Sequence, residues 1–288
     1  MKIPNKTSKI ILDVFNIDNL QAKKRYYWGV NDEFATNWIP ASVVKTFAAA
    51  GALVRLSQLN FGPETVITFK DVNEVISIRN LIEPAIIRSE NMTYNRLVQL
   101  ANHNLINENF LKNYNKTELN SPYIKKDWEK RTSGNVTFSS PQILLSENNR
   151  VVTLEASPER PGKIVPHTSS VTTLDALNKL MIDLVIEKNT GISEENSSLL
   201  LGALGARKAS GEDFSKSIIN QIKIFNFNEN YGKHGFNGEW YSQSFLILDR
   251  NQNIGFNISA VGAIGDKSLL NDIGGEIGRA INSGNIGL

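Results

Sequence analysis

The sequence predicts an α/β fold in which one antiparallel sheet is built from both ends of the chain and flanked by helices, with a mainly helical domain inserted between them. Apolar, β-branched runs gather near the two termini, whereas helical apolar spacing dominates the middle. Strands from the two termini can share a sheet only if the chain leaves it and returns. We therefore predict a sheet domain of residues 1–40 and 215–288 and a helical domain of residues 41–214, with the functional site in the cleft at their interface.

The N-terminal elements follow from short local patterns. Residues 10–15 and 25–30 are rich in β-branched and aromatic side chains and predict an antiparallel hairpin. Pro40 stands just before a long, nearly uncharged run, which predicts a helix over residues 42–59. Residues 65–69 predict a short strand.

Helices and a strand-rich insertion are expected in the middle of the chain. The predicted helices are residues 71–88 with a break at Pro84, residues 92–105, residues 172–190 and residues 199–204. Residues 136–155 predict short strands, a β-hairpin elaboration that either narrows access to the cleft or serves as an interface. Residues 158–167 are expected to form a loop. The C-terminal part predicts strands at residues 221–225, 244–249 and 254–261, then a helix at residues 269–281.

Composition excludes several classes of function. The hydrophobic fraction of 41% and the charged fraction of 21% are those of a globular protein, and a net charge of +2 gives no reason to expect binding to nucleic acid. There is no cysteine, which excludes a thiolate nucleophile, and the three histidines are dispersed, which argues against a metal site. No apolar run reaches transmembrane length. We expect a monomer that binds a small molecule and needs no cofactor.

Ser42 and Lys45 have the spacing of a nucleophile and its base. Three residues apart at the start of a helix, the two side chains share one face. The rest of that helix is apolar, so the ammonium of Lys45 is expected to be partly desolvated, which lowers its pKa and lets it accept a proton from a hydroxyl. Because Ser-x-x-Lys occurs by chance in a chain of this length, the pair carries weight only together with further motifs.

Two further motifs follow in a definite order: Ser89-Glu90-Asn91 and Lys233-His234-Gly235. With Ser42-Val43-Val44-Lys45 they resemble the three signatures of the serine β-lactamase and D,D-peptidase superfamily, most closely the class A β-lactamases. Asn95 and the helix opening Thr172-Thr173 extend the match, which covers most of residues 8–285. Ser146-Glu147-Asn148 repeats the second tripeptide, but in a predicted hairpin turn, so the tripeptide alone means little.

The resemblance implies an acyl-enzyme mechanism. Ser42 attacks the amide carbonyl of a β-lactam, Lys45 takes its proton or orients its hydroxyl, and Ser89 passes a proton to the leaving nitrogen. No step of this scheme requires a metal or a cofactor.

The resemblance also implies how substrate is held. Asn91 binds the amide group in the side chain of the substrate. Lys233, His234 and Gly235 lie along the edge strand, where Lys233 attracts a carboxylate and helps to hold down the pKa of Lys45. The backbone N–H groups of Ser42 and Phe236 form the oxyanion hole.

The sequence departs from the family pattern at two places. His234 replaces a hydroxyl residue, and its imidazole either donates to a substrate carboxylate or only packs at the rim of the cleft. No Glu-x-x-x-Asn or Glu-x-x-Asn pattern precedes Thr172, so the base that activates the deacylating water is unassigned. Glu159 and Glu155 are the candidates, although a loop carboxylate is more often simply exposed.

These departures leave alternatives open. The first is a D,D-peptidase or penicillin-binding type, or another serine hydrolase, with slow deacylation. The second is a non-catalytic domain that retains the fold. The first residues lack the apolar core of a signal peptide, so the protein is expected to be periplasmic or secreted after removal of a signal, or otherwise cytoplasmic.

Overall fold

The computed structural model describes most of the chain as two compact units. The described residues are 8–29, 38, 40–119, 136–162, 170–206, 214–236, 240–263 and 267–288, without the side chains of residues 136–138 and 158–162. One unit, called here the sheet unit, comprises Met1–Val43, Thr172–Glu187 and Leu204–Leu288. The other, called the helical unit, comprises Val44–Val171 and Lys188–Ala203. None of the helices in these described ranges is both long and apolar enough for a membrane span.

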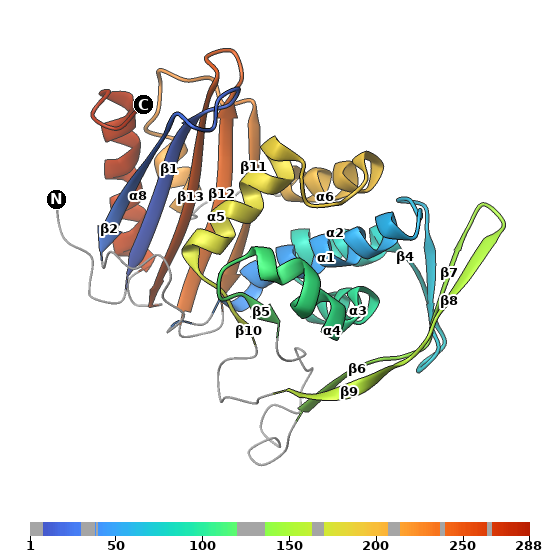
Figure 1. Ribbon diagram of the computed structural model, residues 1–288. Coiled ribbons are helices and arrows are strands. Elements are labelled where there is room, and N and C mark those ends of the chain that lie inside the picture. The colour runs from blue at the N-terminus through green and yellow to red at the C-terminus, as the bar shows by residue number, and fades with distance from the viewer. Residues whose placement is uncertain are drawn as a thin grey trace. The chain divides into compact units, whose positions relative to one another are not determined.

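Five antiparallel strands in the order β11-β12-β13-β1-β2 form the main sheet (Figure 1). Their bounds are β1 Lys9–Asn16, β2 Lys23–Gly29, β11 Glu229–Phe236, β12 Trp240–Asp249 and β13 Ile254–Ala263. The first strand pairs with the last, with Lys9 opposite Val261 and Asn16 opposite Ile254. The predicted α/β fold with a sheet made from both chain ends is therefore confirmed.

Helices cover both faces of this sheet (Figure 1). The helices α7 (Phe214–Ile219) and α8 (Lys267–Asn282) pack on one face, where alternate residues of β1 such as Leu12 and Val14 enter the core. The helix α5 (Leu174–Ile182) packs on the other face and continues as a π-helical turn over Asp183–Glu187.

A buried polar network fixes α5 against the sheet. Asp13, which is almost fully buried, accepts hydrogen bonds from Arg25 at 2.6 and 2.8 Å and from Asn178 at 3.1 Å. Arg25 also donates to Asp175 at 2.6 Å. Asn178 in turn accepts from Ser259 at 2.6 Å. A buried carboxylate is tolerated here because it is paired and fully hydrogen-bonded.

The C-terminal half differs from its prediction at residues 214–219, where the helix α7 was not predicted, and at residues 221–225. Residues 221–225, predicted as a strand, form an irregular segment. The backbone N–H groups of Lys223 and Ile224 donate to Asn282 Oδ1, at 2.6 and 3.2 Å, instead of joining a ladder. The β-branched pattern there was overridden by a side-chain anchor on α8.

The helical unit is built around α1 (Lys45–Gln58), which is buried on nearly all sides and packs on α3. The other helices are α2 Ile78–Glu83, α3 Asn91–Ala101, α4 His103–Leu105 and α6 Glu194–Ala206, the last of which begins in this unit. A π-helical turn over Pro84–Arg88 links α2 to the Ser89 segment, so Pro84 starts a turn rather than breaking the helix.

A small antiparallel sheet, ordered β4-β3-β7-β8, completes the helical unit. Its strands are β3 Val66–Phe69, β4 Glu74–Ser77, β7 Ile143–Glu147 and β8 Arg150–Leu154. The expected hairpin is present, with Asn148 and Asn149 both left-handed (φ 49° and 63°) in a two-residue turn. The prediction of a helix from residue 71 was wrong, because Val75 and Ile76 pair with β3 and α2 begins only after the Ser77 cap.

Two short ribbons account for the remaining strands. One pairs β5 (Glu118–Leu119) with β10 (Ser170–Val171), and the other pairs β6 (Val136–Ser140) with β9 (Ser157–Gly162). The prediction that residues 158–162 belong to a loop was therefore wrong. Prolines are tolerated in a two-stranded ribbon because an outward-facing position needs no N–H donor. Residues 163–167, the rest of that predicted loop, lie outside the described residues.

Candidate active site

Ser42 lies in a 3₁₀ turn, Ala41–Val44, that runs directly into α1. This continuity places Ser42 one helical turn before Lys45, as the sequence spacing predicts. The preceding residue, Ala41, is left-handed with φ 48°, a conformation that an alanine adopts only where its surroundings enforce it. Ser242 Oγ donates to the Pro40 carbonyl at 2.9 Å, and this hydrogen bond holds the start of the turn against β12.

Gly235 brings the third motif to Ser42. A Cβ atom added at position 235 would lie 2.6 Å from Ser42 N, 2.7 Å from Pro40 O and 2.9 Å from Ser242 Oγ. Only glycine therefore lets the β11 backbone pass this close to the nucleophile. Within the sheet unit, the structure brings together the two sequence-predicted groups, Ser42 and the Lys233-His234-Gly235 stretch.

The residues around Gly235 on β11 differ in exposure. Lys233 is buried, and its Nζ donates to the carbonyl of His234 at 3.2 Å. The half-buried His234 ring lies 6.5 Å from the Tyr241 ring, measured between centroids. Phe236 is 55% exposed, so its ring is directed to solvent, and only its backbone N–H is a candidate for the site.

Lys45 is completely buried and has three close oxygen neighbours. Its Nζ donates to Asn91 Oδ1 at 2.7 Å and to the Ser89 carbonyl at 2.6 Å, and Ser89 Oγ lies 3.4 Å away. Burial lowers the pKa of Lys45 to about 7, and the carboxylate of Glu90 partly opposes that shift. The lowered pKa expected from the sequence is thus present. Its largest cause is desolvation.

The Ser89-Glu90-Asn91 stretch reaches Lys45 because of its backbone. Ser89 is left-handed (φ 62°), Glu90 is extended, and α3 begins at Asn91. The turn is held by the Glu90 N–H, which donates to the Pro84 carbonyl at 3.0 Å. The Glu90 side chain points to solvent and accepts from Arg88 at 2.8 Å. Lys45, Ser89 and Asn91 are therefore brought together within the helical unit, as predicted.

The two candidates for the water-activating base are not joined to these residues by any described contact. Glu155 is exposed just after β8, where it accepts from Gln142 at 3.3 Å. Glu159 lies on β9, but its side chain is outside the described residues.

Sequence reasoning missed the residue that fixes α3 from behind. Arg96 is 9% exposed and pairs with Glu74 at 2.8 Å and Asp71 at 3.0 Å, while its guanidinium stacks 4.5 Å from the centre of the Phe69 ring. An arginine on the apolar side of a helix five residues after Asn91 was the available signal.

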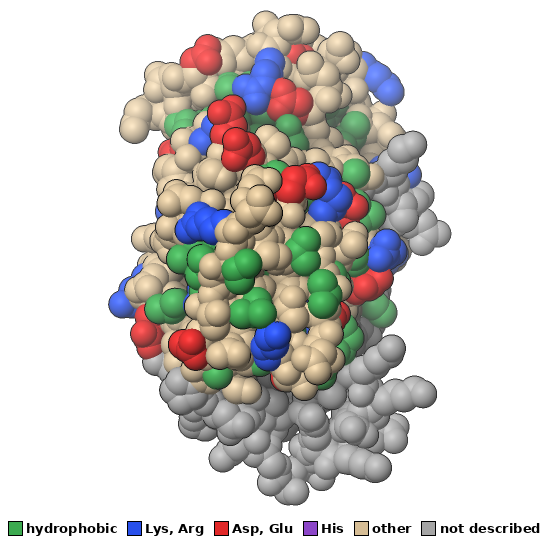
Figure 2. Space-filling view, turned by 90° about the vertical axis from the view of Figure 1, so that its right-hand side faces the viewer, with side chains coloured by type: hydrophobic (Ala, Val, Ile, Leu, Met, Phe, Trp, Pro, Cys, Tyr) green, Lys and Arg blue, Asp and Glu red, His purple; other side chains and the backbone are tan. Residues whose placement is uncertain are grey.

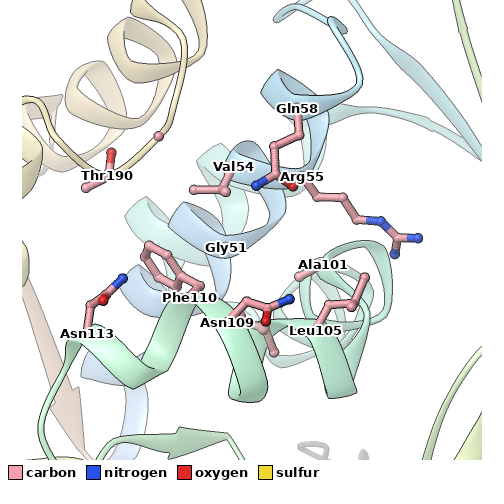
Figure 3. A pocket seen from close by; sticks show the side chains of 12 residues that line it. Gly51, Val54, Arg55, Gln58, Ala101, Leu105, Asn109, Phe110, Asn113 and Thr190 are labelled. Carbon is pink, nitrogen blue, oxygen red and sulfur yellow. The ribbon is translucent and has the colours of Figure 1, made fainter.

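A pocket of about 220 Å³ lies beside the C-terminal half of α1 (Figure 3). Figure 3 shows Val54, Gln58 and Phe110 around it, with the Arg55 guanidinium directed away on the side of Leu105. Arg55 Nη1 donates to the Leu100 carbonyl at 2.9 Å, which makes it a C-terminal cap for α3. None of the motif residues lines this pocket.

Comparison with known proteins gives a likeness in structure alone. No protein-family model matches the sequence, and no curated protein matches it. Among solved structures, a β-lactamase from Xanthomonas campestris superposes with a TM-score of 0.62 at 13% identity, covering 97% of this chain and 92% of that one. The chromosome-encoded β-lactamase of Vibrio parahaemolyticus gives 0.60 at 14% identity, with 96% and 94% covered. A reconstructed ancestral class A β-lactamase gives 0.61 at 15% identity, with 97% and 95% covered.

The chain has the class A β-lactamase fold. The likeness extends over nearly the whole chain, so the resemblance drawn from the three motifs is confirmed for the fold. At such low sequence identity, the structural likeness establishes the β-lactamase fold but not the activity. What the fold does in this protein has to be argued from its own residues.

Proposed function

We propose that this β-lactamase-like protein is a serine hydrolase that forms an acyl-enzyme at Ser42. The observation that carries the proposal is the buried Lys45 whose pKa is lowered to about 7 one helical turn from Ser42. At neutral pH a substantial fraction of such a lysine is uncharged and able to accept a proton. A lysine buried only for packing would have little reason to face two oxygens and an amide from the Ser89 segment.

The chemistry follows from these contacts. Neutral Lys45 takes the proton of the Ser42 hydroxyl while Oγ forms a bond to the substrate carbonyl carbon, and the carbonyl oxygen becomes an oxyanion. The Lys45 ammonium returns a proton through Ser89 Oγ to the leaving nitrogen. The C–N bond then breaks, and the acyl group stays on Ser42 as an ester. Water later hydrolyses that ester.

Substrate recognition is assigned to β11 and α3. The backbone N–H groups of Ser42 and Phe236 form the proposed oxyanion hole, which the close approach at Gly235 supports. Lys233 supplies positive charge for a substrate carboxylate, with His234 beside it, and Asn91 holds an amide. A β-lactam or a peptide that ends in a D-amino acid has these groups.

Deacylation is expected to be slow, which favours the penicillin-binding or D,D-peptidase reading over an efficient β-lactamase. Glu155 is engaged with Gln142 on the surface. Glu159 remains the candidate for a water-activating base.

Intact-mass measurement after mixing with a simple penicillin tests the proposal. We expect the mass of the wild-type protein to increase by the mass of one drug molecule. This adduct should persist much longer than one turnover of an efficient β-lactamase takes. Ser42→Ala should show no increase in mass. Consumption of drug without an adduct would indicate rapid deacylation and direct attention to Glu159→Gln. Wild-type protein that neither binds nor consumes the drug, or Ser42→Ala that is still labelled, would refute the proposal and favour a non-catalytic domain.

A further inference from the structure

Ser242 on β12 has a buried hydroxyl close to the nucleophile. On the face drawn in Figure 2, charged side chains of both signs lie at the surface, where water solvates them. Ser242 is instead fully buried, and burial of a hydroxyl is unfavourable unless it forms a hydrogen bond. Its Oγ donates to the carbonyl of Pro40 at 2.9 Å, two residues before Ser42. The buried hydroxyl is therefore satisfied only while the Pro40 carbonyl keeps this place.

The pairing of β11 with β12 makes this contact possible. Gly235 lies directly opposite Ser242, so the two residues belong to the same face of the sheet. A Cβ atom at Gly235 would lie 2.7 Å from Pro40 O and 2.9 Å from Ser242 Oγ, which is too close for either atom. The glycine thus leaves the space in which the hydroxyl and the carbonyl meet.

Ala41, between Pro40 and Ser42, has an unfavourable backbone conformation. Its φ of 48° lies in the left-handed region, which an alanine adopts only where its surroundings hold it there. That φ is the rotation between the Ala41 Cα atom and the peptide group that contains the Pro40 carbonyl. The carbonyl accepts from the Val43 N–H at 3.3 Å and from the Ser242 hydroxyl at the shorter distance of 2.9 Å. Both hydrogen bonds oppose the rotation that would relieve the strain.

The conformation of Ala41 also sets the direction of the Ser42 N–H, which belongs to the next peptide group. In the proposed mechanism this N–H stabilises the oxyanion together with the N–H of Phe236, which follows Gly235 on β11. Such donors are effective only if they are aimed before the charge develops. The pairing of Gly235 with Ser242 therefore connects the strand that carries one donor to the turn that carries the other.

We propose that Ser242 is a positioning residue for acylation, because its hydrogen bond to Pro40 holds Ala41 in the conformation that aims the Ser42 N–H at the oxyanion. This inference rests on the proposed formation of an acyl-enzyme at Ser42. Ser242 acts through the backbone and transfers no proton. Loss of its hydroxyl should raise the energy of the transition state, in which the oxyanion carries charge, more than that of the bound substrate.

Stopped-flow acylation with a chromogenic cephalosporin tests this role, because it separates the dissociation constant of the first complex from the acylation rate constant. Ser242→Ala should lower the rate constant by about tenfold to 10²-fold and change the dissociation constant by less than about twofold. The midpoint of the pH profile should stay at about 7, because the pKa of Lys45 is set mainly by its own burial.

Ser259→Ala is a matched control for the loss of a buried hydrogen bond. Ser259 on β13 is also fully buried, and its Oγ donates to Asn178 at 2.6 Å. Both variants should melt at a lower temperature than the wild type, but Ser259→Ala should acylate at the wild-type rate. Equal loss of acylation in the two variants would overturn the inference, because the loss would then follow from general destabilisation.

Ala41→Gly tests whether Ser242 acts through the strained residue. Glycine adopts the left-handed conformation without strain, so the hydroxyl has less to hold in this background. Ser242→Ala should then lower the acylation rate constant by about threefold or less, compared with about tenfold or more when residue 41 is alanine. The same reduction in both backgrounds would overturn the inference.

Two outcomes separate this inference from the proposed function. Wild-type protein that is not acylated by the cephalosporin or by a penicillin would refute the proposed function and this inference with it. Wild-type protein that is acylated, but no faster than Ser242→Ala, would overturn this inference alone. Circular dichroism of each variant establishes that it is folded.

Discussion

The tripeptide Ser-Glu-Asn occurs twice in this chain, and its two copies have different surroundings. At residues 89–91 the serine is left-handed and the asparagine begins α3, so both side chains reach the buried Lys45. At residues 146–148 the same letters end β7 and enter a two-residue turn, and the serine lies on the outward face of the small sheet. The chemistry of a short motif therefore comes from its backbone and its neighbours.

Replacing the serine in each copy gives the largest expected difference. Ser89→Ala removes the hydroxyl proposed to carry a proton from Lys45 to the leaving nitrogen, and the rate of Ser42 acylation should fall by about 10²- to 10⁴-fold. The matched control Ser146→Ala should acylate at the wild-type rate. Stopped-flow acylation with a chromogenic cephalosporin measures both. Equal acylation rates for the two variants would show that the Ser89 hydroxyl takes no part in acylation.

The pH dependence of acylation sharpens the comparison, because only the first copy contacts a titrating lysine. Below pH 7 Lys45 is charged and cannot accept the Ser42 proton, so the acylation rate should rise with pH and level off above a midpoint at about 7. The midpoint should be the same in Ser146→Ala. A rate that is flat between pH 5.5 and 8.5, measured under single-turnover conditions, would contradict a basic role for Lys45.

The glutamates of the two copies should give the smallest effects. The Glu90 carboxylate raises the pKa of Lys45, so Glu90→Gln should move the acylation midpoint down by roughly half a pH unit, as expected of an exposed charge.

Glu147 accepts from the backbone N–H of Gly62 at 2.9 Å. Glu147→Ala should therefore cost about 1 kcal/mol of stability and leave the midpoint unchanged. The acylation pH profile measures the shift of the midpoint, and urea denaturation measures the loss of stability. A shifted midpoint in Glu147→Ala, with none in Glu90→Gln, would contradict the roles given to the two glutamates.

Much of the fold could be predicted from the sequence because its patterns are local. The terminal strands, the helix after Pro40 and the β7–β8 hairpin each have a clear period or turn signal. The prediction that the two chain ends share one sheet followed from order alone and is confirmed. β4 was missed because Glu74–Ser77 is too short to show a period, and its pairing with β3 decided its structure.

The candidate site was predictable in part for the same reason. The spacing of Ser42 and Lys45 is local, and the structure keeps it. That Lys45 meets Asn91 depends on a left-handed Ser89, and no propensity predicts that conformation for a serine. The Ser242 contact with Pro40 joins positions about two hundred residues apart, so only the folded sheet reveals it.

The pairing of β1 with β13 also sets the order in which the chain can fold. Lys9 faces Val261, so β1 cannot gain its inner neighbour until β13, which lies far later in the chain, has been made. The helical unit is mostly continuous, from Val44 to Val171, and can collapse while synthesis proceeds. Until β13 emerges, β2 is the only strand of the main sheet with which β1 pairs, and the edge of β1 that will face β13 remains exposed.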